Sequence, residues 1–284
     1  MNIVVCIKQV PDTSDVKIDS KTNNLVREGV PSIVNPYDVY ALEAGLRLKD
    51  KFGGKVTVVS MGPPQTRSAL AFCLEMGADE AVLLSDRVLG GSDTLATGYA
   101  LSELIKPLEP DIILCGNEAI DGCTGQVGPI IAGNLDIPQF TYVTKFDIEG
   151  DLIKVCRDSG KKLDFYEARL PALLCVLKGI NKPRKHNETD KVPKVVDAAT
   201  AKLDLARVGC DGSPTKVVSI SMSNVRAKSY VTIDDSLGWE DRIQMIIDGG
   251  IKKKSRINLW RGTPDGLAER ILNIDAIKRS FGML

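Results

Sequence analysis

The sequence predicts an α/β protein built on a doubly wound, mostly parallel sheet, with an antiparallel hairpin addition and a C-terminal arm. Three observations predict this class. In the first half of the chain, short β-branched runs alternate with helical segments of about 10 to 15 residues, which is typical of βαβ units. From about residue 140, apolar and polar residues alternate with a period of two, as they do in antiparallel strands. After residue 179 the chain becomes polar and basic, with two prolines.

The parallel part opens with the β-branched run 2–10, which predicts a central strand, and a small hairpin is expected over 16–27. Asn35 and Pro36 then predict a helix start, because proline suits the first helical turn and asparagine can cap it. Strands are expected next at 55–60, 80–85 and 111–115, and helices at 36–49, 65–76, 93–106 and 124–135.

The second half begins with three expected antiparallel strands, at 141–148, 152–157 and 161–169, and a buried strand at 172–177 that returns to the main sheet. Residues 181–196 are expected to form a solvated arm or linker. Further on, the patterns predict a weak helix at 198–205, a break at 209–214, a strand at 216–220 and helices at 239–247 and 266–281. The predicted domains are therefore 1–180, an α/β domain; 181–254, an arm; and 255–284, a C-terminal extension.

Composition excludes several classes of function. The 37 basic residues balance the 37 acidic ones, so net charge gives no reason to expect nucleic-acid binding. No apolar run approaches the roughly 18 residues of a membrane span, and the N-terminus does not resemble a signal peptide, so a cytoplasmic protein without membrane insertion is expected. The seven cysteines form no C-x-x-C pair, and the single histidine, His186, lies in a polar stretch. We therefore expect no metal site and no catalytic side chain.

The most informative stretch is 115–129, which follows an apolar strand and carries four glycines and Thr124. Backbone N–H groups at such a strand-to-helix turn form a natural anion site, although an ordinary glycine-rich loop has the same composition. Ligands of parallel sheets bind outside the carboxyl ends of the strands. Four of those ends, at 6–10, 60–63, 85–94 and 115–124, are rich in glycine, proline or hydroxyl residues. Their convergence favours a nucleotide site.

Several short motifs occur in a recognisable order, at 3–11, 35–36, 60–63, 119–121, 126–128, 157–158, 170–171 and 180–184. In this order and at these spacings the chain resembles the β subunit of electron-transfer flavoproteins, up to about Lys254. The resemblance implies a Rossmann-like fold of the adenine-nucleotide α-hydrolase-like type, and a partner α subunit that carries FAD. In the ordinary branch the β subunit binds AMP as a structural ligand, and in the bifurcating branch it binds a second FAD. The stretch 90–97, rich in glycine and hydroxyl residues, resembles the bifurcating branch.

The resemblance also implies roles for individual residues. The backbone of Cys6, together with Asn35 and Asp38, would hold adenine and ribose, and Met61 would lie against the adenine. The phosphates would be cradled by Gly116, Asp121, Thr124, Gly125, Gln126 and Val127. The flavin would lie near Gly91, Ser92, Asp93, Thr94 and Thr97. Three of these residues have plainer interpretations: core packing for Met61, an N-cap for Asp93 and a first-turn dipole partner for Asp38.

The expected activity follows from the bifurcating branch. NADH would reduce the β-bound FAD, after which one electron would pass to ferredoxin and the other, through the α-subunit FAD, to a flavin-containing dehydrogenase. The chain would act only as one subunit of such an NAD-linked flavin oxidoreductase, with 181–254 binding a partner. Two alternatives stay open: an ordinary β subunit with structural AMP, and an adenine-nucleotide-binding regulatory domain without a redox role.

Overall fold

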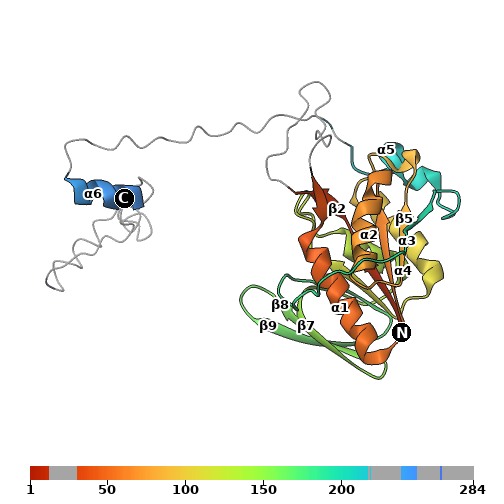
Figure 1. Cartoon of the computed structure of the whole chain (residues 1–284), viewed down its shortest axis with the longest axis horizontal. Helices are drawn as coiled ribbons and strands as arrows, with labels where there is room; N and C mark the ends of the chain where they lie inside the picture. The colour runs from red at the N-terminus through yellow and green to blue at the C-terminus, as the bar shows by residue number, and fades with distance from the viewer. Residues whose placement is uncertain (13–30, 217, 219–237, 248–262, 264–284) are drawn as a thin grey trace, which may run out of the picture. The chain divides into compact units, whose positions relative to one another are not determined.

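The computed structural model describes residues 1–12, 31–216, 218, 238–247 and 263, which Figure 1 draws in colour. The chain falls into two compact units, Met1–Ile220 and Ser221–Leu284. In the second unit, helix α6 (Trp239–Ile247) forms where a helix was predicted. The hairpin predicted at 16–27, the helix at 266–281 and most of the strand at 216–220 lie outside the described residues.

The first unit contains a nine-stranded sheet in the order β11-β5-β4-β1-β6-β10-β7-β8-β9. Its seven strands from β11 to β7 pair in parallel. Strands β7, β8 and β9, which are labelled in Figure 1, pair antiparallel. Its strands are β1 (Asn2–Cys6), β4 (Lys55–Met61), β5 (Glu80–Leu84), β6 (Ile112–Gly116), β7 (Gln139–Glu149), β8 (Leu152–Asp158), β9 (Leu163–Arg169), β10 (Ala172–Val176) and β11 (Lys194–Val196). This is the predicted fold class, and β10 returns to the main sheet as expected.

Helices cover both faces of the sheet, which makes it doubly wound. In the described part of this unit the α-helices are α1 (Pro36–Phe52), α2 (Arg67–Glu75), α3 (Thr94–Ile105), α4 (Val127–Leu135) and α5 (Gly209–Gly212). Short 3-10 turns lie at η1 (Pro64–Thr66), η2 (Arg87–Leu89), η3 (Lys106–Leu108) and η4 (Leu205–Arg207).

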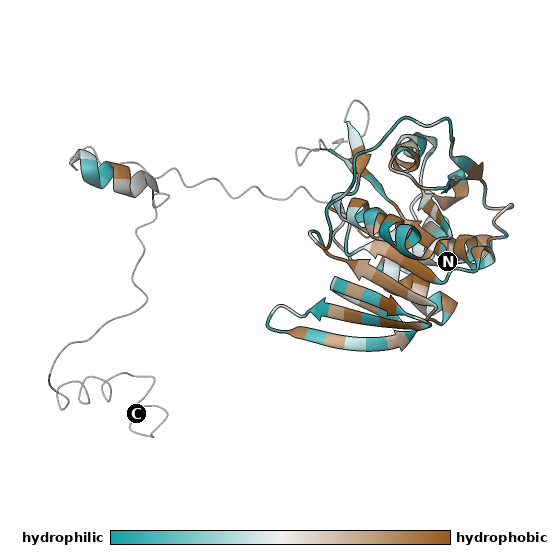
Figure 2. Ribbon diagram, turned by 60° about the horizontal axis from the view of Figure 1, so that its bottom comes forward, coloured by the Kyte–Doolittle hydropathy of each residue, from teal (hydrophilic) through white to brown (hydrophobic). Residues whose placement is uncertain are grey.

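Successive residues of the central strands point into two different cores. Ile3 and Val5 of β1 join the core beneath α1 and α2, whereas Val4 joins the core beneath α3 and α4. Because both faces of these strands are buried, their sequence is continuously apolar. Figure 2 shows this contrast: the central strands are mostly hydrophobic, whereas colours alternate along the β7–β9 strands.

The prediction of one strand over 2–10 was wrong. The chain leaves the main sheet after Cys6, and β2 (Gln9–Pro11) pairs antiparallel with β3 (Ser32–Val34) in a separate two-stranded sheet. The break is caused by partners from a later part of the chain, since the Lys8 N–H donates to Asp38 Oδ2 at 2.7 Å and the Lys8 carbonyl accepts from the Asn35 N–H at 2.8 Å. These bonds replace the sheet ladder at that point.

The described residues after Ile180 in the first unit pack onto the rest of that unit, where a solvated arm or linker was predicted. Within the expected arm, β11 pairs with β5 and so extends the main sheet. Turns occupy 198–202, where a weak helix was expected, and α5 forms inside the expected break at 209–214. The short runs here are shaped by packing, because Ala198, Leu203 and Val208 are buried in a third core cluster beside Tyr99. The role of 181–254 in partner binding stays a prediction.

Candidate nucleotide site

A crevice of about 390 Å³ opens at the carboxyl ends of β1 and β6. These two strands are neighbours in the sheet, yet the chain runs from β1 to β4 and β5 on one side before it returns to β6 on the other. Such a reversal of strand order is the place where doubly wound sheets bind ligands. The walls come from the segments that follow β1 and β6 and from the starts of α3 and α4.

All but two of the residues predicted for the site line this crevice: Cys6, Asn35, Asp38, Met61, Ser92, Asp93, Thr94, Thr97, Gly116, Thr124, Gly125, Gln126 and Val127. The first exception is Gly91, where a Cβ atom would overlap the Cys210 side chain. The second is Asp121, whose carboxylate pairs with Lys8 Nζ at 2.7 Å. The fold therefore brings the predicted set together, and its role in binding stays a prediction.

Asn35 ties the start of α1 to the loop after β6. It occupies the N-cap position of α1, but its side chain makes no capping bond. Instead Asn35 Nδ2 donates to Asp38 Oδ1 and to the Glu118 carbonyl, each at 2.9 Å, and Oδ1 accepts from the Ile120 N–H at 3.2 Å. The side chain is 1% exposed, so these bonds are made in a dry environment where an unpaired amide would be costly.

Asp38 completes this buried junction. Its carboxylate accepts from the N–H groups of Lys8 and Gly116 and from the Asn35 amide. Burial raises the pKa of Asp38 to about 7, against the lowering effect of these hydrogen bonds. The residue is therefore more than a first-turn dipole partner of α1, because it holds three chain segments at the floor of the crevice.

The start of α4 presents backbone donors to the crevice. Gln126 occupies its N-cap position without a side-chain capping bond, and the preceding Gly125 has a φ of +61°, which favours glycine. The Gln126 side chain instead accepts from the Thr94 hydroxyl at 2.8 Å, which joins the starts of α3 and α4. N–H groups of a first helical turn that lack a side-chain acceptor suit an anion.

Asp93 is the N-cap of α3, as its plainer interpretation proposed. Its Oδ1 accepts from the Ala96 N–H at 2.9 Å, and its Oδ2 accepts from the Thr215 N–H at 3.0 Å and the Thr215 hydroxyl at 2.7 Å. Desolvation raises the pKa of Asp93, but these hydrogen bonds outweigh it and the net pKa is lowered. Met61 packs against two core clusters, as its plainer interpretation proposed, and it also lines the crevice. Its contact with an adenine stays a prediction.

Sequence reasoning missed Lys8 and Asn117, which also line the crevice. Lys8 lies two residues after the end of β1, so its place near a strand end was a usable signal. Asn117 is 6% exposed, and its Oδ1 accepts from the Tyr142 N–H at 2.8 Å. Tyr142 lies far along the chain, on a strand whose pairing the sequence does not specify, so no local signal predicted this contact.

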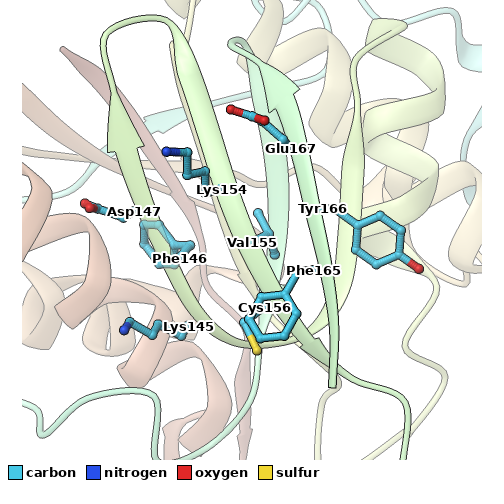
Figure 3. A pocket seen from close by; sticks show the side chains of 9 residues that line it. All are labelled: Lys145, Phe146, Asp147, Lys154, Val155, Cys156, Phe165, Tyr166 and Glu167. Atoms are coloured by element: carbon cyan, nitrogen blue, oxygen red, sulfur yellow. The ribbon is translucent and has the colours of Figure 1, made fainter. Parts of the chain in front are cut away.

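A second cavity, of about 450 Å³, lies on the antiparallel strands β7, β8 and β9. Figure 3 shows its lining side chains, among them Phe146, Val155 and Phe165. It contains none of the predicted site residues and no helix start, so the crevice at β1 and β6 is the better candidate. The described residues hold no group of three or more potential metal ligands. Within the same residues, no helix has the length and apolarity to cross a membrane.

A doubly wound sheet with uncapped helical N–H groups at its switch point is the arrangement of nucleotide-binding α/β proteins. Comparison with known proteins identifies the family: the model of the electron transfer flavoprotein domain matches residues 22–202. The chain belongs to the electron transfer flavoprotein β subunit family.

Three relatives illustrate the match. The chain is 49% identical over 237 residues to the electron transfer flavoprotein subunit beta of Clostridium acetobutylicum, covering 81% of this chain and 92% of that one. It is 45% identical over 269 residues to the subunit beta of Megasphaera elsdenii, covering 89% and 97%. It is 51% identical over 186 residues to the caffeyl-CoA reductase-Etf complex subunit CarD of Acetobacterium woodii, covering 65% and 71%.

Proposed function

We propose that this chain is the β subunit of an electron-bifurcating electron transfer flavoprotein and holds FAD in the crevice. NADH would deliver electrons to this site, and they would leave toward ferredoxin and, through the FAD of an α subunit, toward a flavin-containing dehydrogenase. The observation that carries the proposal is the extent of the crevice. It runs from the floor at Asn35 and Asp38, past the start of α4, to Ser92, Thr94 and Thr97 at the start of α3.

The residues of the crevice fit the parts of a dinucleotide. The uncapped start of α4 offers N–H donors to a pyrophosphate. Gly116 lets the end of β6 pack closely against the start of α1, because a Cβ atom there would lie 2.6 Å from Tyr37 Cβ. Thr97 adds a hydroxyl in the first turn of α3. Asp93 contributes to the wall rather than to the ligand, because both of its carboxylate oxygens already accept bonds from the protein. A bound FAD would supply the redox chemistry, accepting electrons from NADH and releasing them one at a time.

The relatives support the proposed partners. Two of them are named as a subunit beta, which implies an α subunit beside them, and the third is named as part of a complex with caffeyl-CoA reductase. By analogy, this chain would pair with an α subunit and deliver electrons to a reductase or dehydrogenase that binds an organic substrate.

The deciding experiment is a nucleotide count on the purified complex of the chain with its α subunit. We expect FAD beyond the amount carried by the α subunit, and bleaching of the extra flavin absorbance by NADH. AMP in place of that FAD would contradict the proposal and identify an ordinary β subunit. Failure to purify with any flavoprotein subunit would point to a regulatory domain without a redox role.

The site itself is tested by substitution. Asp93→Ala and Thr94→Ala remove the cap of α3 and the hydroxyl that joins α3 to α4, so β-bound FAD should be lost more readily on dialysis. Thr144→Ala is a matched control, because Thr144 Oγ1 donates to the Cys156 carbonyl on the antiparallel strands, outside the crevice lining. Full FAD content in both crevice variants would contradict the assignment.

A further inference from the structure

The wall of the crevice carries unbalanced charge. Among the described residues that line it, Lys8 is the only basic side chain, whereas Asp38, Asp93 and Glu118 are acidic. A nucleotide phosphate placed here needs donors or a cation to offset the carboxylates. Lys8 is the side chain in the lining that can supply the positive charge.

The backbone of Lys8 is fixed while its side chain reaches across the crevice mouth. The N–H donates to Asp38 Oδ2 at 2.7 Å, and the carbonyl accepts from the Asn35 N–H at 2.8 Å. From this anchor, Nζ reaches the loop between β6 and α4 and lies 2.7 Å from Asp121 Oδ1. It also lies 4.0 Å from the position that a Cβ atom on Gly122 would take. The ammonium group therefore stands beside the loop that leads into the uncapped start of α4.

The contact with Asp121 is easily exchanged. The two side chains are 49% and 22% exposed, and an ion pair so open to water contributes little to stability. A phosphate oxygen offers the same ammonium group a charge-assisted hydrogen bond of the kind that the carboxylate makes. The backbone anchor keeps Lys8 at the crevice whichever anion it binds.

We propose that the Lys8–Asp121 ion pair closes the phosphate end of the crevice, and that Lys8 exchanges Asp121 for a phosphate of the bound nucleotide. This inference rests on the proposed nucleotide site, but it applies to any phosphate-bearing adenine nucleotide. An ionised carboxylate cannot donate to a phosphate, so the Asp121 side chain competes with the ligand for Lys8. The two partners therefore act on affinity in opposite directions.

The test is calorimetric titration of AMP, FAD and adenosine into the complex with the α subunit, after bound nucleotide has been removed. Lys8→Met should weaken the binding of AMP and FAD by about tenfold to hundredfold, which is the loss expected for one hydrogen bond to a charged group. The affinity for adenosine should stay unchanged. Lys8→Arg should restore most of the affinity. Asp121→Asn should tighten AMP binding by about twofold to fivefold, which corresponds to the free energy of an exposed ion pair.

Lys178→Met is the control for long-range charge. Lys178 Nζ lies 4.5 Å from the centre of the Tyr37 ring, near the crevice but outside its lining, so AMP affinity should stay unchanged. Equal weakening of AMP and adenosine by Lys8→Met, or weaker AMP binding by Asp121→Asn, would overturn the inference and leave the pair a structural role.

The outcomes also separate this inference from the proposed function. Wild-type protein that binds AMP but not FAD would refute the bifurcating assignment while the Lys8 effect on AMP could still appear. Wild-type protein that binds FAD, with AMP affinity unaffected by Lys8→Met, would refute only the exchange at Lys8. If none of the three probes binds the wild type, both proposals fail.

Discussion

At the scale of single residues, two buried polar side chains shape the crevice floor. Asn35 and Asp38 are 1% and 6% exposed. Their side chains bond to each other and to the backbone of Lys8, Glu118 and Ile120, which are distant in sequence. Buried polar groups specify one geometry because an unpaired donor or acceptor costs about 1–3 kcal/mol. The floor is therefore set by a few directional bonds, with apolar packing beneath it.

Asp38 should make stability depend on pH in an unusual direction for an aspartate. Its pKa rises from 3.8 to about 7 because burial disfavours the ionised form, so between these values the folded protein binds more protons than the unfolded chain. Stability through this group is highest below pH 3.8 and falls as the pH rises to about 7. The unfolding free energy of the wild type, minus that of Asp38→Asn, should therefore fall as the pH rises across this range, by at most about 1.4 kcal/mol per pH unit. Urea unfolding at several pH values measures it, and parallel pH curves would refute it.

At the scale of elements, specific side chains join segments that the sheet alone does not fix. The Thr94–Gln126 bond links the starts of α3 and α4. Glu43 of α1, 3% exposed, accepts from the Arg184 backbone N–H at 3.1 Å, from Arg184 Nε at 2.9 Å and from Arg47 Nε at 2.8 Å. The bonds between Glu43 and Arg184 attach the start of the 181–196 segment to α1.

This attachment predicts an asymmetry between its two partners. Arg184→Met leaves a buried carboxylate with Arg47 as its remaining cation, so it should cost about 2 kcal/mol, below the 3–5 kcal/mol of a fully broken buried pair. Glu43→Leu removes the buried charge and leaves two arginines that water can reach, so it should cost less. Thermal unfolding of both variants compares them. A larger cost for Glu43→Leu would show that hydrogen bonding to the 181–196 segment outweighs the burial of charge.

At the scale of the whole molecule, the first unit extends to Ile220 because its sheet and cores need the later residues. The strand β11 extends the sheet beyond β5, and Val196, Ala198, Leu203 and Val208 fill a core cluster with Leu84 and Tyr99. A boundary at residue 180, as composition suggested, would cut through this cluster.

Two truncated chains distinguish the boundaries. A chain ending at Ile220 keeps the three core clusters and should unfold cooperatively near the midpoint of the full chain. A chain ending at residue 180 loses the apolar partners of Leu84 and Tyr99, each buried aliphatic side chain being worth about 1.5–3 kcal/mol, and should unfold at a clearly lower midpoint. Circular dichroism melts would measure both. Equal midpoints would support the boundary drawn from composition.

Much of this arrangement could be predicted from the sequence. Continuous apolar runs determined the buried parallel strands, period-two alternation determined β7 to β9, and Pro36 in the first helical position determined where α1 begins. Glycines and hydroxyl residues after those strands located the crevice, because parallel strands place their carboxyl ends at one edge. These signals are local, since each depends on residues within one or two turns or strands.

Tertiary structure decided the rest, because those features depend on partners far apart in the chain. The strand predicted over 2–10 ends at Cys6 because Lys8 bonds to Asp38 and Asn35, a choice that no local propensity records. The polar run 181–196 looked like a free arm, yet Glu43 and the edge of β5 bind it to the domain. Asp121, predicted among the phosphate contacts, pairs with Lys8, a partner that the sequence did not indicate, and its place beside a phosphate stays a prediction. Long-range hydrogen bonds and charge pairs form only once the sheet has brought their partners together, so the sequence located the crevice and the fold determined its walls.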